Sequence, residues 1–159
     1  YIEAGRVNDE AGYELIPNVS PDTKLKAYVL DDSCQKKPFG GWGDLYIMDL
    51  TTGTTKNLEN VNSCDVDSYH TWSSSGHWFV FSSKRMDGLW ARPYIAAFNP
   101  ETGETGKAFL LPQKDPMFYD NYTYTYNRPE LIKTAVKNGK EFEKIIQQAA
   151  IPSTPKKIR

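Results

Sequence analysis

Two carboxylates and an imidazole stand close together where Asp65, Asp67 and His70 precede a strongly apolar run. Alternate residues of a strand share one face, so both carboxylates could point the same way and bind calcium, a hard cation. Two carboxylates are few for calcium, however, and His is a poor ligand for it, so hydrogen bonds that cap a loop are the alternative. We therefore expect no cofactor and no catalytic role for His70, and Asp65 and Asp67 are the residues that a metal would use.

Cationic and aromatic side chains gather around the sequence DGLW at residues 87–90. Arginine beside an aromatic ring suits binding of a protein, a peptide or a sugar. A tryptophan between glycines at residues 39–43 could join them, because glycine lets another chain approach closely. The alternative is ordinary solvated charge. The candidate binding residues are Trp42, Lys84, Arg85, Trp90 and Arg92.

The chain has two cysteines, Cys34 and Cys64, and no C-x-x-C motif, so a zinc ribbon, a thioredoxin-type site and a haem-attachment site lack support. Two free thiols are one interpretation. The other is a disulfide that ties two loops together in an oxidising compartment, which requires Cα atoms within about 7 Å of each other.

Catalytic motifs are missing from the sequence. It has no G-x-S-x-G, H-E-x-x-H, P-loop or G-x-G-x-x-G motif, and it offers no placed pair of carboxylates for glycoside hydrolysis. The net charge of −1 gives no bias toward nucleic acid or an anionic membrane, and no apolar run is long enough to span a membrane. The N-terminus has no signal-like segment, which fits a cytosolic protein or one whose signal has been removed. We expect a protein that is not an enzyme.

The elements that position these residues form a repeat. Short strands are predicted at residues 25–30, 44–50 and 54–58, and again at 77–82, 92–99 and 105–111, separated by turn sequences. Ser20 matches Ser73, Tyr46 matches Tyr94 and Gly53 matches Gly103, which gives a period of about 50 residues. With one more strand before each serine turn, each unit has four antiparallel strands. This is typical of propeller blades, where large rings such as Trp72 and Trp78 pack between neighbours or contact a ligand.

The second copy reads W-S-x-x-G-x-W-x-x-F-S-S from Trp72, followed by x-Y-x-x-x-[DN]-x-x-T-G-[ET] around Tyr94, and the first copy is similar. This pattern resembles the TolB-like propeller repeat. The stretches YHTWS, FSSKR-x-DGL, FLLPQKDP and YN-x-PE are also similar to propeller proteins of Bacteroidetes-type bacteria. The resemblance extends over residues 17–130 and is specific for fold more than for function.

The predicted fold is all-β, with about two four-stranded antiparallel propeller blades and a C-terminal helix. Blades occupy residues 1–126, with repeats at about 17–64 and 65–115, and YTYTY at 122–126 could begin another strand. An amphipathic helical segment follows at 127–150, because Asn127, Pro129 and Glu130 favour a helix start. That helix packs on its own domain or docks a partner. Residues 151–159 are a flexible basic tail.

Two blades cannot close a ring, so we expect a part of a larger propeller or an assembly with other blades or subunits. The resemblance implies a non-catalytic binding or scaffolding module of the bacterial cell envelope, periplasmic or associated with the outer membrane. Its loop face would bind a protein, a peptide or a glycan. The alternative is the accessory propeller of a peptidase or glycosidase whose catalytic domain lies outside this chain. A third possibility is a blade set that completes the ring of a partner.

Overall fold

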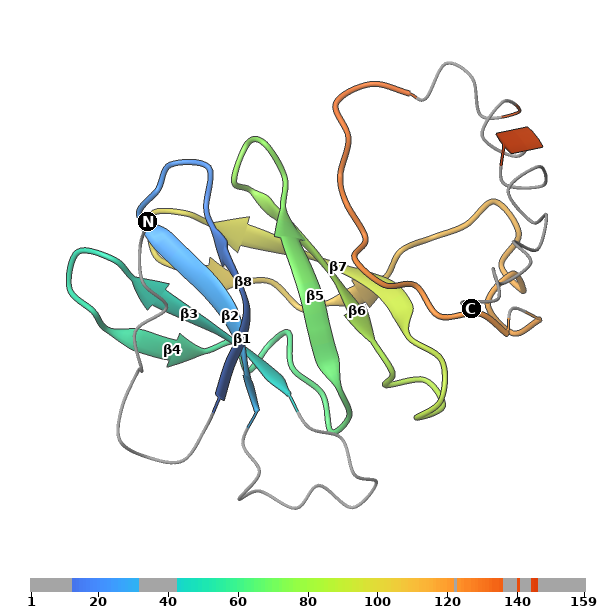
Figure 1. Cartoon of the computed structure of the whole chain (residues 1–159), viewed down its shortest axis with the longest axis horizontal. Coiled ribbons are helices and arrows are strands. Elements are labelled where there is room, and N and C mark those ends of the chain that lie inside the picture. Colours follow the sequence, from blue (N-terminus) through green and yellow to red (C-terminus); the bar gives the residue numbers. More distant parts are fainter. Residues whose placement is uncertain (1–12, 32–42, 122, 136–139, 141–143, 146–159) are drawn as a thin grey trace, which may run out of the picture.

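The computed structural model describes residues 13–31, 43–121, 123–135, 140 and 144–145. Within these ranges the chain forms two antiparallel sheets (Figure 1), with the orders β1-β2-β3-β4 and β5-β6-β7-β8, and β9 pairs with β7 beside the second order. We call the first sheet the first blade, and the second sheet with β9 the second blade. The predicted all-β class and its antiparallel four-strand units are confirmed. The strands are β1 (Tyr13–Val19), β2 (Leu25–Asp31), β3 (Asp44–Asp49), β4 (Thr55–Asn57), β5 (Asp67–Trp72), β6 (Trp78–Ser83), β7 (Arg92–Asn99), β8 (Glu104–Thr105) and β9 (Phe109–Leu110).

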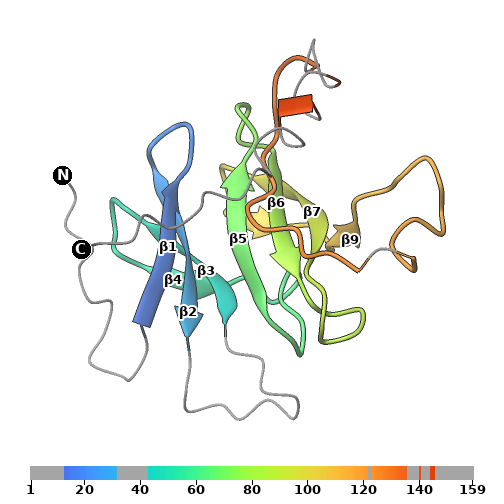
Figure 2. The same ribbon diagram turned by 45° about the vertical axis from the view of Figure 1, so that its right-hand side comes forward.

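The core lies between the two blades, because each blade turns one apolar face toward the other. Alternate residues of β2, including Ala27 and Val29, are buried there, and so are Phe79 and Phe81 of β6. Strand β5 contacts β1, β2 and β3, and it stands beside the first blade in Figure 2. Trp72 of β5 packs edge-on against Phe79 and Phe98 in this core, with centroids 4.9 and 4.5 Å apart.

The prediction that large rings pack between blades is therefore confirmed for Trp72. It is wrong for Trp78, which is 43% exposed on the opposite face of the second blade. The physical reason is the pleat of the strand. Trp78 neighbours Phe79 in β6, and consecutive residues of a strand point to opposite faces, so only Phe79 can enter the core.

The serine turns of the two blades are equivalent in detail. Ser20 N–H donates to the Leu25 carbonyl at 2.8 Å, and Ser73 N–H donates to the Trp78 carbonyl at 2.8 Å. In each turn the serine hydroxyl also accepts the N–H of the first strand residue, at 3.0 Å for Leu25 and 3.1 Å for Trp78. The residue three after each serine has a positive φ, and it is Thr23 in the first blade and Gly76 in the second.

The turns after β3 and β7 also match. Asp49 Oδ1 accepts the N–H groups of the second and third residues after it, and Asn99 Oδ1 does the same in the second blade. The turns end at Gly53 and Gly103, whose N–H groups donate to the carbonyls of Asp49 and Asn99 at 2.8 and 2.9 Å. Both glycines have φ near +70°, a conformation that favours glycine.

A β-bulge interrupts the first strand of each blade at the same place. The register of β1 on β2 shifts between Leu15 and Asn18, and that of β5 on β6 shifts between Ser68 and Thr71. Inside the bulges, Ile16 and Tyr69 have φ of 55° and 51°. The spacing of 53 residues between them equals that between the serine turns. The repeat thus includes an irregularity of the backbone that gives no sign in the sequence.

The outermost strand of the second blade differs from the expected single strand at 105–111. Instead, β8 pairs with the end of β7 and β9 pairs with its beginning, with residues 106–108 between them. Gly106 lies against Ala97, and its N–H donates to the Ala97 carbonyl at 2.9 Å. The expected strand at 122–126 is not found at its described residues, 123–126.

The prediction of a helix that starts at residues 127–130 is wrong, because residues 127–135 are not helical. Their backbone is held by the second blade instead: the Thr71 hydroxyl donates to the Pro129 carbonyl at 2.7 Å. Lys140, Lys144 and Ile145 are helical, and the rest of the predicted segment up to residue 150, with the tail at 151–159, lies outside the described residues. In the part of the chain that is described, no helix is long and apolar enough to cross a membrane.

Candidate functional site

Asp67 and Arg85, two residues singled out from the sequence, form a buried ion pair. Asp67 opens β5 with its side chain fully buried, and its Oδ1 lies 2.6 Å from Arg85 Nη2. Asp67 Oδ2 accepts both the N–H and the hydroxyl of Ser63, at 2.6 and 2.8 Å. Arg85 also donates to the Val61 carbonyl and the Ser83 hydroxyl, at 2.6 and 2.7 Å. The carboxylate is thus satisfied by groups within the chain.

The guanidinium of Arg85 is enclosed as well as paired. It lies over the rings of Tyr94 and Phe81, 4.5 and 5.4 Å from their centroids. Its bond to the carbonyl of Val61 reaches the connection between the blades. Arg85 therefore fastens the second blade to this connection, and its side chain is only 19% exposed.

The expected metal candidates take part in loop geometry. Asp65 is buried, and its Oδ1 accepts the N–H of Val66 at 2.8 Å, while Asp67 is occupied by Ser63 and Arg85. Among the described residues, no group of three His, Cys, Asp or Glu side chains could hold a metal ion. These contacts agree with the alternative prediction, in which the two carboxylates make hydrogen bonds that cap a loop.

His70 lies in the core between the blades, 1% exposed and stacked on Phe79 at 5.4 Å. Neither of its ring nitrogens has a hydrogen-bond partner among the described residues. Burial lowers the pKa of His70 to about 4, an effect that the neighbouring Ala27 backbone partly opposes. The imidazole is therefore neutral at ordinary pH, and it is enclosed by the core.

Arg92 is buried at the start of β7 and joins two loops. It donates to the Trp90 carbonyl at 2.8 Å and to the Tyr119 carbonyl at 3.1 Å. Its Nη2 also lies 2.9 Å from Asp87 Oδ2. The loop between β6 and β7 is thereby tied to the segment at 112–121.

The loop between β6 and β7 presents apolar side chains to solvent on a fixed backbone. Asp87 Oδ1 accepts the N–H groups of Leu89 and Trp90, both at 2.9 Å. Partial burial raises the pKa of Asp87, but these two hydrogen bonds and the Arg92 charge outweigh it and hold the pKa below its usual value. Leu89 is 69% exposed and Trp90 is 36% exposed. We call residues 86–90 the DGLW loop.

The predicted binding residues are thus only partly brought together. Trp90 is on the exposed DGLW loop and Lys84 is half-buried beside it, whereas Arg85 and Arg92 are directed inward, which differs from the expected exposed patch. Trp42 lies outside the described residues. The binding role of Lys84 and Trp90 stays a prediction.

Cys64 is exposed in the connection between the blades and forms no disulfide with a described residue. Its predicted partner, Cys34, lies outside the described residues, so the disulfide stays a prediction.

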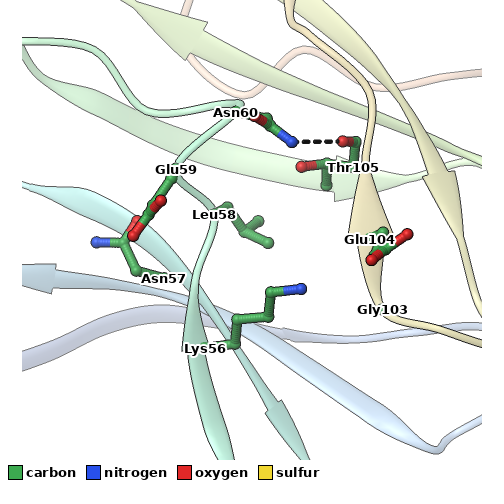
Figure 3. Close-up of a pocket in the computed structure, with 8 residues that line it drawn as sticks. All are labelled: Lys56, Asn57, Leu58, Glu59, Asn60, Gly103, Glu104 and Thr105. Carbon is green, nitrogen blue, oxygen red and sulfur yellow. Dashed lines mark hydrogen bonds between the residues drawn. The ribbon is translucent and has the colours of Figure 1, made fainter.

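A separate hollow of about 470 Å³ opens between the outer strands of the two blades (Figure 3). On one side it is lined by residues of β4 and the connection that follows it, and on the other by β8 and the glycine that precedes it. Asn60 Nδ2 donates to the Thr105 carbonyl at 3.0 Å and bridges the two sides. The lining is mostly polar and includes both signs of charge, from Lys56, Asn57, Leu58, Glu59, Asn60, Gly103, Glu104 and Thr105.

Reasoning from the sequence missed the exposed side chains of Met86 and Leu89 and the residues of this hollow. For Leu89, a usable signal was present, since an apolar residue directly after Asp-Gly falls at the tip of a turn. For the hollow there was none, because residues 56–60 and 103–105 are brought together only by the packing of the blades.

Two antiparallel sheets, one of four strands and one of five, repeated along the chain and packed face to face, define this chain as part of a propeller-like fold. No protein-family model matches the sequence, and no curated protein matches it. Among solved structures, it is similar to "The beta-propeller domain of the Trilobed protease from Pyrococcus furiosus", described as having an open velcro topology. The TM-score is 0.46 at 17% identity, and the match covers 64% of this chain and 30% of that one.

Proposed function

We propose that this chain is a non-catalytic binding module of the bacterial cell envelope that holds a protein or peptide on its DGLW loop. The observation that carries the proposal is the rigid presentation of Leu89 and Trp90. Both side chains are exposed while their N–H groups are fixed by Asp87, and Asp87 is fixed in turn by Arg92. A preorganised apolar anchor loses little conformational entropy on binding, which favours affinity.

Further exposed apolar groups support a protein or peptide as the ligand. Met86 on the same loop is 45% exposed, and Met117 on the segment that Arg92 ties to this loop is 56% exposed. Methionine adapts to varied apolar partners. A glycan would use Trp90 alone for stacking and would leave Leu89 and the methionines unused.

The envelope location and the TolB-like character rest on the resemblance of the repeats. An antibody against the chain, applied to fractions of the source bacterium, tests the location. Recovery in the periplasmic or membrane fraction is expected, and recovery in the cytosol contradicts this part of the proposal.

Binding itself is tested with a phage-displayed peptide library and a glycan array as probes. Peptides selected on the wild-type chain should bind at least about tenfold more weakly to a Leu89→Ala, Trp90→Ala double variant. Val19→Ala is the control, because Val19 is apolar and 40% exposed but lies beside the serine turn of the first blade, at the other end of the strands. Equal affinity for the double variant, or hits on the glycan array alone, would contradict the proposal.

A further inference from the structure

Residues 126–130 contact the second blade in the way that β5 contacts the first blade. Asp67, the first residue of β5, donates its N–H at 3.1 Å to the carbonyl of Gly43, which directly precedes β3. Tyr126 donates its N–H at 2.9 Å to the carbonyl of Ala91, which directly precedes β7. Both acceptors are the last residue before the third strand of their blade, so Tyr126 takes the place of Asp67, 59 residues later.

A second hydrogen bond supports the same equivalence. Asn18 of β1 donates its side-chain Nδ2 to the carbonyl of His70, in the first strand of the next blade, at 3.4 Å. Thr71 has the place of Asn18 in the second blade, and its hydroxyl donates to the carbonyl of Pro129 at 2.7 Å. Pro129 therefore takes the place of His70, and the offset is again 59 residues.

The backbone conformation agrees with these two bonds. Ile16 in the bulge of β1 and Tyr69 in the bulge of β5 have φ of 55° and 51°, and Arg128, 59 residues after Tyr69, has φ of 55°. Positive φ is uncommon outside glycine. Among the described residues only four others than glycine have it, and three of these hold the same position of the repeat. Figure 2 shows the orange segment that contains Arg128 passing β5 and β6.

Residues 126–130 thus occupy the place of the first strand of a third blade, and we call them the third-blade strand. In the first two blades this strand leads into a serine turn and pairs with a second strand, β2 or β6. The third copy has Ile132 at the position of the serine, and Lys140, at the position of Phe81 of β6, is helical. No described strand pairs with residues 127–130, so none fills the edge at which β1 and β5 receive their second strand.

The sheet surface beside this edge is apolar and exposed. Trp78 is equivalent to Leu25 of the first blade, which packs in the core between the blades and is 8% exposed, whereas Trp78 is 43% exposed. Phe109 of β9, on the same face as Trp78, is 48% exposed. Ser82 on this face is only 1% exposed, and its hydroxyl donates to the Tyr126 carbonyl at 2.5 Å. The third-blade strand therefore covers its own part of the face and leaves open the part that further strands would cover.

We propose that the third-blade strand is a docking site for a β-strand of another polypeptide, which pairs antiparallel with residues 127–130 and lays apolar side chains over Trp78 and Phe109. The repeat defines the chemistry of this partner. In the second blade the strand at this place is β6, which pairs with β5 and turns Phe79 and Phe81 toward the first blade. The partner strand should likewise carry large apolar residues at alternate positions. Backbone hydrogen bonds then supply affinity, and the alternate side chains supply specificity.

The test is hydrogen exchange in the wild-type chain, followed by NMR at the amides of Asn127 and Glu130. By the offset of 59 residues, these two residues are equivalent to Ser68 and Thr71, which lie opposite residues of β6. The probe is a synthetic peptide with the sequence of residues 76–85, which contains β6. At a saturating concentration, the peptide should slow exchange at both amides at least about fivefold, because each gains a hydrogen bond.

The matched control is the same peptide with N-methyl groups at the residues that correspond to Val80 and Ser82, which lie opposite β5 in the second blade. This control keeps every side chain but loses the N–H groups needed for pairing, so exchange should not change. In the chain, Glu130→Pro removes an N–H from the open edge and should abolish the effect of the peptide at Asn127. Glu130→Ala keeps the N–H and should preserve the effect.

Unchanged exchange with the unmodified peptide would overturn the proposal, and so would equal slowing by the N-methylated peptide, because side chains alone would then bind. Slow exchange at both amides in the chain alone would overturn it as well. A dependence on chain concentration would then assign the edge to a second copy, and no such dependence would assign it to a segment of the same chain. The peptide control uses the wild-type chain, so these outcomes do not depend on the folding of the Glu130→Pro variant.

Discussion

Arg85 Nη2 lies 2.6 Å from Asp67 Oδ1, and the Asp67 side chain has no exposed surface. Removing one partner of a buried ion pair leaves an uncompensated charge, which costs about 3–5 kcal/mol. Arg85→Ala should therefore lower the free energy of unfolding by that amount, as measured by urea denaturation near neutral pH. Lys84→Ala is the control at the neighbouring cation, and a change within about 0.5 kcal/mol is expected for it.

The same variant separates two roles of Arg85. If its main role is structural, Arg85→Ala weakens binding to the DGLW loop only as far as it unfolds the chain. A variant as stable as the wild type that no longer binds selected peptides would contradict the structural role and support the original prediction of a binding residue.

His70 should make the stability depend on pH. Its pKa is about 4 in the folded chain and about 6.5 when exposed, so below pH 6.5 the unfolded chain binds a proton that the folded chain does not. Stability is therefore complete above pH 6.5, falls as the pH drops from 6.5 to 4, and loses about 3 kcal/mol in all. Urea denaturation between pH 4 and pH 7.5 measures this fall.

A His70→Phe variant isolates the contribution of the imidazole. Phenylalanine keeps a ring against Phe79 and cannot be protonated. The unfolding free energy of the variant should therefore be nearly constant between pH 5 and pH 7. An equal loss in the variant over that range would assign the pH dependence to other groups.

Thr23 occupies a turn position where the second blade has Gly76, and both have φ between 60° and 75°. A left-handed conformation costs a residue with a Cβ about 1–2 kcal/mol, and glycine avoids most of this cost. Thr23→Gly should raise the midpoint of thermal unfolding and stabilise by about 0.5–1 kcal/mol. Gly76→Ala should do the opposite by a similar amount, because no atom lies within 4 Å of the added Cβ and only the backbone strain counts. The same sign for both variants would refute this explanation.

Asp87 should control the order of the DGLW loop. Asp87→Ala removes the acceptor of the Leu89 and Trp90 N–H groups, so hydrogen exchange at these two amides should become at least tenfold faster. Asp87→Asn keeps an oxygen acceptor and should change the exchange much less. Exchange that is equally fast in both variants would show that the charge pair with Arg92, and not the hydrogen bonds, fixes the loop.

Local sequence signals were enough to predict most of the blade architecture. The serine turns, the glycines at 53 and 103 and the alternation of β2 and β6 depend on contacts within a few residues, so their positions could be inferred. The strand β7 was predicted with its observed bounds, Arg92–Asn99. The start of β1 at Tyr13 was missed, because the residues before Pro17 lack a clear strand pattern.

Features that depend on distant contacts were not predictable. The sequence Asn127-Arg128-Pro129-Glu130 favours a helix start locally. However, the Thr71 hydroxyl of β5 binds the Pro129 carbonyl and the Ser82 hydroxyl of β6 binds the carbonyl of the preceding Tyr126, and these bonds hold the segment along the sheet. Likewise, Asp67 and Arg85 are 18 residues apart, and nothing in their neighbourhood shows that they pair. Charged residues near a loop therefore suggested an exposed patch, whereas the fold turned two arginines inward.

The connections between strands keep nearly the same lengths at one end of the two blades and have different lengths at the other end. At one end, the serine turns and the glycine turns agree bond for bond between the copies. At the other end, 12 residues separate β2 from β3 but 8 separate β6 from β7. The molecule thus has a constant end and a variable end, and lengthening or shortening the DGLW loop should leave the constant end unchanged. New specificities could arise at the variable end without redesign of the blades that carry it.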